Sequence, residues 1–218
     1  MNNIKKAILI TYIVAIIMFL LDQGTKQWVI NTMPITVDTT SQTFSSHPSY
    51  KFLPFLWFTH VVNFGAAWSI FYGKRFTLLL LAGCISLGVI YFEFTSRKYR
   101  TKTLSAAIGF IMAGAAGNIF DRARMGYVTD FFDLRWAWAD TNPITIMGHK
   151  FFEFKEGYNI FPIWNVADMS IDAGIALLII YFFFQEHKIK KDLDTSSENT
   201  TELNKESSTT EMVTNDNP

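Results

Sequence analysis

The chain has 218 residues, of which 50% are hydrophobic and 16% aromatic, and its 19 basic residues balance 19 acidic ones. Balanced charge provides no general positive field, so the composition argues against nucleic-acid binding. The single cysteine, Cys84, excludes an intramolecular disulfide and a metal site built from cysteines.

Apolar segments of membrane length recur along the chain. A membrane-spanning helix needs about 20 mainly apolar residues. Such helices are predicted at about 7–30, 74–94, 103–122 and 163–185. The pattern therefore predicts a mainly α membrane protein, a bundle of four transmembrane helices within one domain of residues 1–191.

The connections between these helices differ in composition. The first outer region, about 31–72, contains an aromatic and β-branched stretch at 52–62 that predicts one or two short strands, preceded by loop at 31–50. Residues 131–163 are predicted to form a long aromatic-rich loop, or flap, at the membrane surface. The polar segment 192–218 cannot bury enough apolar surface to fold, so a disordered cytoplasmic tail is expected there.

Clusters of positive charge predict the orientation of the bundle. Basic residues occur at 5–6, within 97–102 and at 188–191. The positive-inside rule assigns all three clusters to the cytoplasm. Both termini are therefore predicted to be cytoplasmic, with the β region and the flap on the extracytoplasmic side.

Polar residues occur in the outer part of the first predicted helix and at the end of the predicted strands. Asp22 and Lys26 are four residues apart on one helical face, so they can form an ion pair. A simple interfacial ion pair suffices to explain these two residues alone. Asn63 and Gly65 end the strand region, where an Asn can fix the backbone by hydrogen bonds and a Gly permits close approach.

The third apolar segment combines small residues with a polar outer end. Small residues such as Gly109 and Gly117 recur at four-residue spacing, which lets helices approach closely. The segment then ends in polar residues that share one face: Asn118, Asp121 and Arg122. Packing explains the small residues, but it does not explain these polar ones.

Two further acids, Asp130 and Asp168, lie at the edges of apolar segments. Carboxylates near hydrocarbon are costly and usually functional. Asp168 shares a helical face with Asn165 and Asp172, and this face must point into the bundle because lipid does not tolerate it. If Asp130 and Asp168 meet on one side of the bilayer, they can share a proton, as an aspartic peptidase requires.

Other chemistries have weaker support in the sequence. His149 and Glu153 are four residues apart but form no H-E-x-x-H motif, so no metal site is expected. A Ser–Lys peptidase would depend on Lys26, which Asp22 keeps charged. A small proton-coupled transporter also uses intramembrane carboxylates and stays open as the alternative, although the chain lacks repeated halves.

Five motifs resemble those of the bacterial lipoprotein signal peptidases (signal peptidase II). They begin at Asp22 (D-x-x-T-K), Asn63 (N-x-G-A-A-W), Gly117 (G-N-x-x-D-R), Gly126 (G-x-V-x-D-F) and Asn165 (N-x-A-D-x-x-I). Each motif is weak alone, but together they occur in the family's order over residues 7–184.

The resemblance implies an intramembrane aspartic endopeptidase of the bacterial inner membrane. Such an enzyme removes signal peptides from prolipoproteins, cleaving before the diacylglyceryl-modified cysteine, and needs no cofactor. Its expected partners are these precursors and membrane lipids, and we expect a monomer. The resemblance also implies a small extracytoplasmic β cradle beside the four-helix bundle.

By motif position, the resemblance implies Asp130 and Asp168 as the catalytic pair. The residues expected to support the site or bind substrate are Asp22, Lys26, Asn63, Gly65, Asn118, Asp121, Arg122 and Asn165. Asp121 is the rival for the pair, but its neighbour Arg122 favours a structural carboxylate. Asp172 stands where the family typically has an uncharged residue, and it either repels the charge of Asp168 or acts as a neutral hydrogen-bonding acid.

Overall fold

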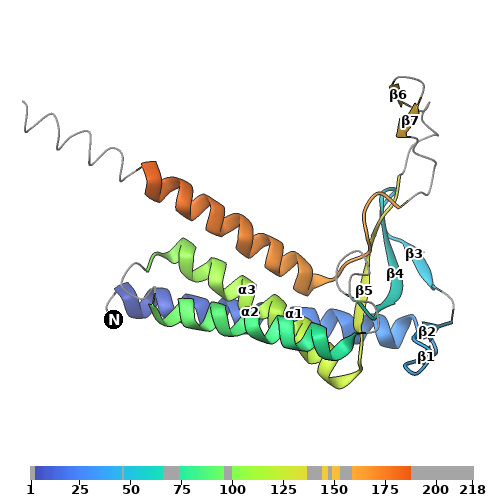
Figure 1. The fold of residues 1–218 in the computed structure, drawn as a ribbon, viewed down its shortest axis with the longest axis horizontal. Coiled ribbons are helices and arrows are strands. Elements are labelled where there is room, and N and C mark those ends of the chain that lie inside the picture. The colour runs from blue at the N-terminus through green and yellow to red at the C-terminus, as the bar shows by residue number, and fades with distance from the viewer. Residues whose placement is uncertain are drawn as a thin grey trace, which may run out of the picture.

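The computed structural model describes residues 3–45, 47–65, 74–95, 100–136, 144–146, 149–152 and 159–187. Its main elements are the helices α1 (Asn3–Thr32), α2 (Arg75–Thr95) and α3 (Lys102–Arg124), and a C-terminal helix, Val166–His187. Figure 1 shows α1, α2 and α3 running alongside one another, with the C-terminal helix (orange) at an angle to them and a small sheet at one end.

Three of the described helices are long and apolar enough to span a membrane: Ile4–Thr32, Lys102–Arg124 and Val166–His187. The apolar part of α2 is shorter, Leu79–Thr95. The predicted class, a mainly α membrane protein, is therefore confirmed. Four membrane spans, with α2 as the second, stay a prediction.

Small residues let α3 pack closely against its neighbours. A Cβ atom added to Gly109 would lie 2.6 Å from the carbonyl oxygen of Thr11 in α1. On the C-terminal helix, a Cβ atom on Gly174 would lie 2.8 Å from the carbonyl oxygen of Ala107 in α3. These helices therefore approach at distances that a larger side chain would prevent, as the small-residue spacing predicts.

A three-stranded antiparallel sheet lies at one end of the helices (Figure 1), in the order β3 (Ser49–Lys51), β4 (Leu56–Asn63), β5 (Val128–Leu134). The strand expected at 52–62 is present as β4, whereas β3 lies mostly in the segment 31–50 that was predicted as loop. Strand β5 was not predicted, and the assignment of residues 131–134 to the flap was wrong. Strand β5 forms by pairing with a distant segment, as in Asn63↔Val128, and local pattern does not reveal such a partner.

Two further strand pairs occur in segments predicted as loop. The first outer segment contains β1 (Val37–Asp38) and β2 (Thr43–Phe44). The flap contains the pair β6 (Ile144–Ile146) and β7 (His149–Phe152). The loop prediction was wrong at these strands, which are only two to four residues long and too short to show a clear alternation. The tail at 192–218 lies outside the described residues.

A small core fastens the sheet to the outer end of α1. Val29 of α1 and Met33, which directly follows α1, pack against Phe131 of β5, and all three side chains are at most 1% exposed. Burying an aromatic or large aliphatic side chain contributes about 2 kcal/mol. This core fixes β5, and with it Asp130, relative to the helices.

Candidate active site

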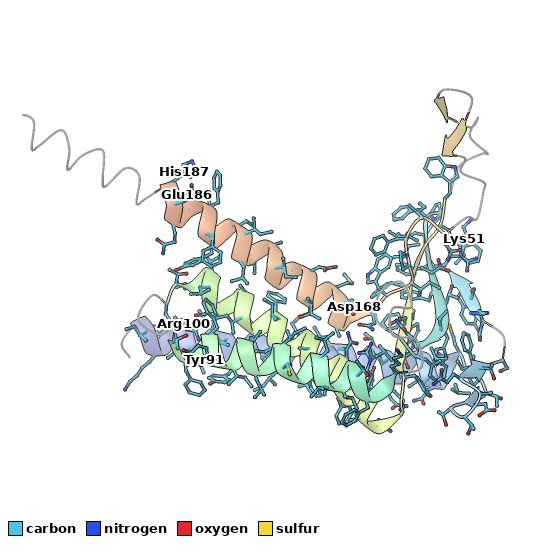
Figure 2. All side chains as sticks on the ribbon, viewed as in Figure 1. Lys51, Tyr91, Arg100, Asp168, Glu186 and His187 are labelled. Atoms are coloured by element: carbon cyan, nitrogen blue, oxygen red, sulfur yellow. The ribbon has the colours of Figure 1, made fainter. Side chains whose placement is uncertain are left out.

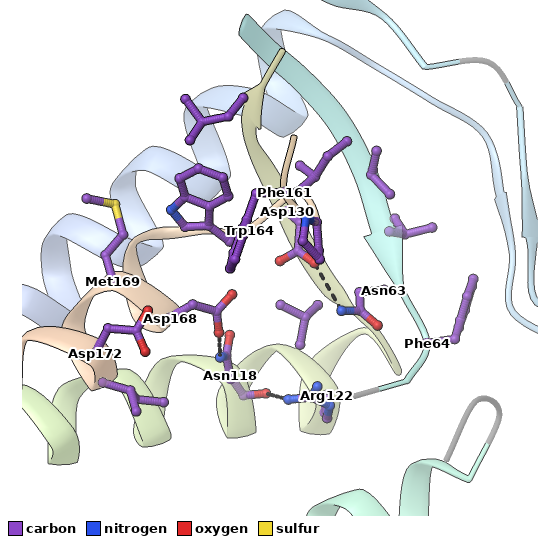
Figure 3. A pocket seen from close by; sticks show the side chains of 17 residues that line it. Asn63, Phe64, Asn118, Arg122, Asp130, Phe161, Trp164, Asp168, Met169 and Asp172 are labelled. Carbon is purple, nitrogen blue, oxygen red and sulfur yellow. Dashed lines mark hydrogen bonds between the residues drawn. The ribbon is translucent and has the colours of Figure 1, made fainter. Parts of the chain in front are cut away.

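A cavity of about 910 Å³ lies where β4 and β5 meet α3 and the C-terminal helix. Both predicted acids line it, Asp130 from β5 and Asp168 from the first turn of the C-terminal helix. Three other predicted site residues also line the cavity: Asn63, Asn118 and Arg122. Figure 3 shows these side chains converging from separate elements of the fold.

Asp130 is 3% exposed and is held by two amide groups. Its Oδ2 accepts a hydrogen bond from Asn63 Nδ2 at 3.1 Å, and its Oδ1 accepts one from Asn165 Nδ2 at 2.6 Å. Burial, and secondly the nearby charge of Asp168, raise the pKa of Asp130 to about 7. This acid can therefore exchange its proton near neutral pH, as a general acid or base must.

Asp168 is the third residue of its helix and belongs to a capping box. Asn165 precedes the helix, and its Oδ1 accepts the backbone N–H of Asp168 at 3.0 Å. In return, Asp168 Oδ2 accepts the backbone N–H of Asn165 at 3.3 Å. Asn118 Nδ2 donates to the other oxygen, Asp168 Oδ1, at 2.7 Å. The position of this carboxylate is thus set by the helix end and by α3.

One side chain, Asn165, connects the two acids. Its oxygen accepts from Asp168, while its amide nitrogen donates to Asp130 Oδ1 and, at 3.3 Å, to Asn118 Oδ1. Asn165 is fully buried. A single buried amide with both ends engaged therefore fixes the strand acid relative to the helix acid.

Behind the cavity, Lys26 joins α1 to α3. Its Nζ lies 2.9 Å from Asp22 Oδ2, 2.8 Å from Asp121 Oδ2 and 3.2 Å from Asn118 Oδ1. The lysine is 2% exposed and both acids are 1% exposed. The simple interfacial ion pair suggested for Asp22 and Lys26 is therefore wrong, because the pair is buried and shared with a third charge.

This arrangement bears on two alternatives. A Ser–Lys peptidase would depend on Lys26, which lies between Asp22 and Asp121 and does not line the cavity. Asp121, the rival for the acid pair, is committed to Lys26 and does not line the cavity. A structural role for Asp121 stays a prediction.

Asp22 also caps the helix that carries Asp168. Its Oδ1 accepts the backbone N–H of Ala167 at 2.9 Å. Gly117 of α3 makes room for this contact, because a Cβ atom there would collide with the Asp22 carboxylate. Sequence reasoning missed Gln23, whose Nε2 donates to both Asp22 and Asp121 at 3.0 Å. Its position next to Asp22, within one turn of Lys26, was the available signal.

Arg122 fixes the chain beyond β4. Its Nη2 donates to the carbonyl oxygen of Gly65 at 2.8 Å, and its Nη1 donates to that of Asn118 at 3.3 Å. The backbone N–H of Gly65 donates to Asn63 Oδ1 at 2.9 Å, which orients the amide that holds Asp130. The rest of that motif, residues 66–68, lies outside the described residues.

A buried cluster around Asp133 was not anticipated from the sequence. Asp133 accepts hydrogen bonds from Thr59 Oγ1 at 2.6 Å, Arg135 Nε at 2.8 Å and Asn159 Nδ2 at 2.7 Å. Leu134 also accepts the backbone N–H of Ile160 at 2.8 Å. The cluster holds the two ends of the flap together beside the cavity. The close sequence spacing of Asp133 and Arg135 was a signal, but Asn159 comes from the far end of the flap.

The expected extra acid, Asp172, lines the same cavity and is exposed. It makes no hydrogen bond or ion pair with any part of the chain that the structure describes. Figure 3 shows it one turn along the C-terminal helix from Asp168.

Comparison with known proteins gives a consistent result. The family model described as "Signal peptidase (SPase) II" matches residues 14–184. A lipoprotein signal peptidase of Halothermothrix orenii is 33% identical over 175 residues, which are 80% of this chain and 96% of the relative. One from Listeria monocytogenes is 30% identical over 179 residues, 82% of this chain and 96% of the relative.

Solved structures of bacterial membrane enzymes have a similar fold. A bacterial membrane enzyme determined by the in meso method at 2.3 Å resolution has a TM-score of 0.59 and 28% sequence identity, covering 81% of this chain and 88% of that one. A second such enzyme, at 1.9 Å, has a TM-score of 0.57 and 29% identity, covering 79% and 91%.

Proposed function

Because the chain belongs to the signal peptidase II family, whose members remove signal peptides from prolipoproteins, we propose that Asp130 and Asp168 are its catalytic dyad. The observation that carries this assignment is that both acids line one cavity and are hydrogen-bonded by the same amide, Asn165. The comparisons give no support to a proton-coupled transporter. The protein is a protease of the aspartic type that this family uses.

In the resting dyad, Asp168 is ionised and Asp130 is protonated. Asp168 lies in the first turn of a helix, where the helix dipole and N–H donors stabilise negative charge. Asp130 is more deeply buried, and its raised pKa of about 7 favours the protonated form at neutral pH. The two acids therefore hold one proton between them, the state that aspartic peptidases use.

Hydrolysis then needs only these two groups and water. Asp168 takes a proton from a water molecule, whose oxygen forms a bond to the scissile carbonyl carbon. Asp130 donates a hydrogen bond to the oxygen that becomes negative. The C–N bond then breaks while the proton held by Asp168 passes to the leaving amine, and the new carboxyl group is released. No covalent intermediate with the enzyme is required.

The remaining site residues act by position. Asn63 and Asn165 hold Asp130, and Asn118 holds Asp168. The buried pair Asp22 and Lys26 fixes the outer end of α1 against Asn118 and the C-terminal helix. In the same way Asp121 fixes Lys26 and Arg122 fixes Gly65.

The location of the protein follows from the charge pattern. Basic residues occur at 5–6, near the beginning of α1, and at 188–191, which follow the C-terminal helix in the sequence. The positive-inside rule therefore favours cytoplasmic termini and a cavity on the extracytoplasmic side of the bacterial inner membrane. On this proposal the sheet is the extracytoplasmic cradle, residues 1–191 are the peptidase domain, and the enzyme acts as a monomer surrounded by lipid.

A precursor-cleavage assay tests the dyad. The purified protein in detergent micelles is incubated with a lipid-modified precursor, and kcat/KM is measured for Asp130→Asn, Asp168→Asn and the control Asp38→Asn. Asp38 is the exposed last residue of β1. Each dyad variant should lose at least about 100-fold, because proton transfer contributes 10²–10⁴-fold. Near-normal cleavage by either dyad variant would reject the assignment.

A further inference from the structure

Asp172 is a third acid in the cavity, and the mechanism above gives it no role. It lies four residues after Asp168 on the C-terminal helix, and Figure 3 shows both carboxyl groups on the cavity side of that helix. Unlike Asp130 and Asp168, it has no hydrogen-bond partner among the described residues. Its carboxyl group is therefore free to contact something that enters the cavity.

Two neighbours of Asp172 on its helix are apolar. Its neighbours Met169 and Ile171 also line the cavity, and the whole helix is one of the candidate membrane spans. An unpaired carboxyl group in such a setting is costly. A substrate that supplies a polar partner at this point would remove part of that cost, whereas an aliphatic substrate group would leave it in place.

The depth of Asp172 indicates which part of the substrate it meets. Four helical residues advance about 6 Å, so Asp172 lies about 6 Å deeper in the membrane than Asp168. On the proposed function, the signal peptide runs inward from the cleaved bond, and an extended chain advances about 3.3 Å per residue. Asp172 therefore lies at the level of about the second residue before the cleaved bond.

We propose that Asp172 is a specificity-determining residue that hydrogen-bonds a hydroxyl side chain at this substrate position. A hydroxyl group both donates and accepts, so it can pair with the carboxyl group in either protonation state. A site with an unpaired polar group discriminates against a substrate that lacks the matching partner. The enzyme should therefore favour threonine over valine there, although these two side chains have nearly the same shape.

Matched substrates test this proposal. Lipid-modified precursors carry either Thr or Val at the first, second or third residue before the cleaved bond, and kcat/KM is measured for each pair in detergent. The wild-type enzyme should prefer Thr by about fivefold or more at one of these positions, most strongly near the second. Asp172→Leu should abolish that preference, while Asp172→Asn, which keeps hydrogen-bonding groups, should retain part of it.

A control variant on the same helix separates this effect from a general disturbance. Ile175 is 46% exposed but does not line the cavity, so Ile175→Val should leave the Thr/Val ratio unchanged. If Asp172→Leu gives the wild-type ratio at all three positions, the inference is wrong while the proposed function stands. Because the inference rests on that function, failure of the wild-type enzyme to cleave any precursor would reject both.

Discussion

Replacing Asp130 by Asn should stabilise the folded protein at alkaline pH while removing activity. The pKa of this acid is raised from 3.8 to about 7 in the fold, chiefly by burial. For a group whose pKa is raised on folding, the favourable contribution is complete below about pH 4 and is lost as the pH rises through about 7. Above that range the protein must keep a buried charge that Asn does not carry.

The size of the effect follows from the shift. A change of about three pKa units corresponds to about 4 kcal/mol at about 1.4 kcal/mol per unit, which is an upper limit. Against this, both Asp130 oxygens accept amide donors, and an Asn side chain offers only one acceptor oxygen. Loss of one hydrogen bond costs about 1–2 kcal/mol. The net stabilisation of the variant above neutral pH is therefore about 2–3 kcal/mol.

Thermal unfolding in detergent at pH 5 and pH 8 measures this prediction. About two of these pKa units lie between pH 5 and pH 7, so wild type should lose about 3 kcal/mol relative to the variant between pH 5 and pH 8. For a chain of this size, 1 kcal/mol corresponds to about 2–4 °C in Tm, so the variant should gain roughly 5–10 °C on wild type over that range. Asp38→Asn is the control, because local hydrogen bonds lower the pKa of that exposed acid. A Tm difference between variant and wild type that is the same at both pH values would refute the reasoning.

Three further predictions concern the residues around the dyad. Asn165→Ala removes the amide shared by the two acids and should lower kcat by about 100-fold or more, whereas a normal kcat would show that the link is dispensable. Lys26→Met leaves the two buried carboxylates that pair with Lys26 without their cation, and it should destabilise the fold by about 3–5 kcal/mol. Thermal unfolding measures this loss, and an unchanged Tm would contradict it. Gly117→Ala should lower both Tm and activity, because its methyl group collides with the Asp22 carboxylate. Gly24→Ala should lower neither, because its added methyl group meets nothing within 4 Å. Equal effects of the two variants would show that the contact of Asp22 with the C-terminal helix is unimportant.

Much of the helical framework could be predicted from sequence because membrane length and apolar composition are local properties. The ends of α1 and α3 were expected within a few residues of where they occur. The gathering of Asp22, Asn118 and Asp168 was also predicted, from the orientation that the positive-inside rule favours and the depth that the helical rise gives.

The contacts that complete the site were less accessible. Strand β5 exists because it pairs with β4, and Asp133 is buried because Thr59 and Asn159 reach it from other segments. The sequence motif identified Asn165 as a site residue but did not predict that it bonds both acids. That double contact requires β5 to lie beside the beginning of the C-terminal helix. Pairing between distant segments leaves no periodic pattern in either one.

The hydrogen bond from Ala167 to Asp22 has a consequence for how the enzyme is made. It joins positions 145 residues apart, one in the first helix and one in the last helix that the structure describes. Synthesis proceeds from the N-terminus, so Asp22 and Lys26 enter the membrane long before the helix that carries Asp168. If Asp130 and Asp168 are the dyad, the site can form only after the final helix is inserted, and an incomplete chain still attached to the ribosome should be inactive.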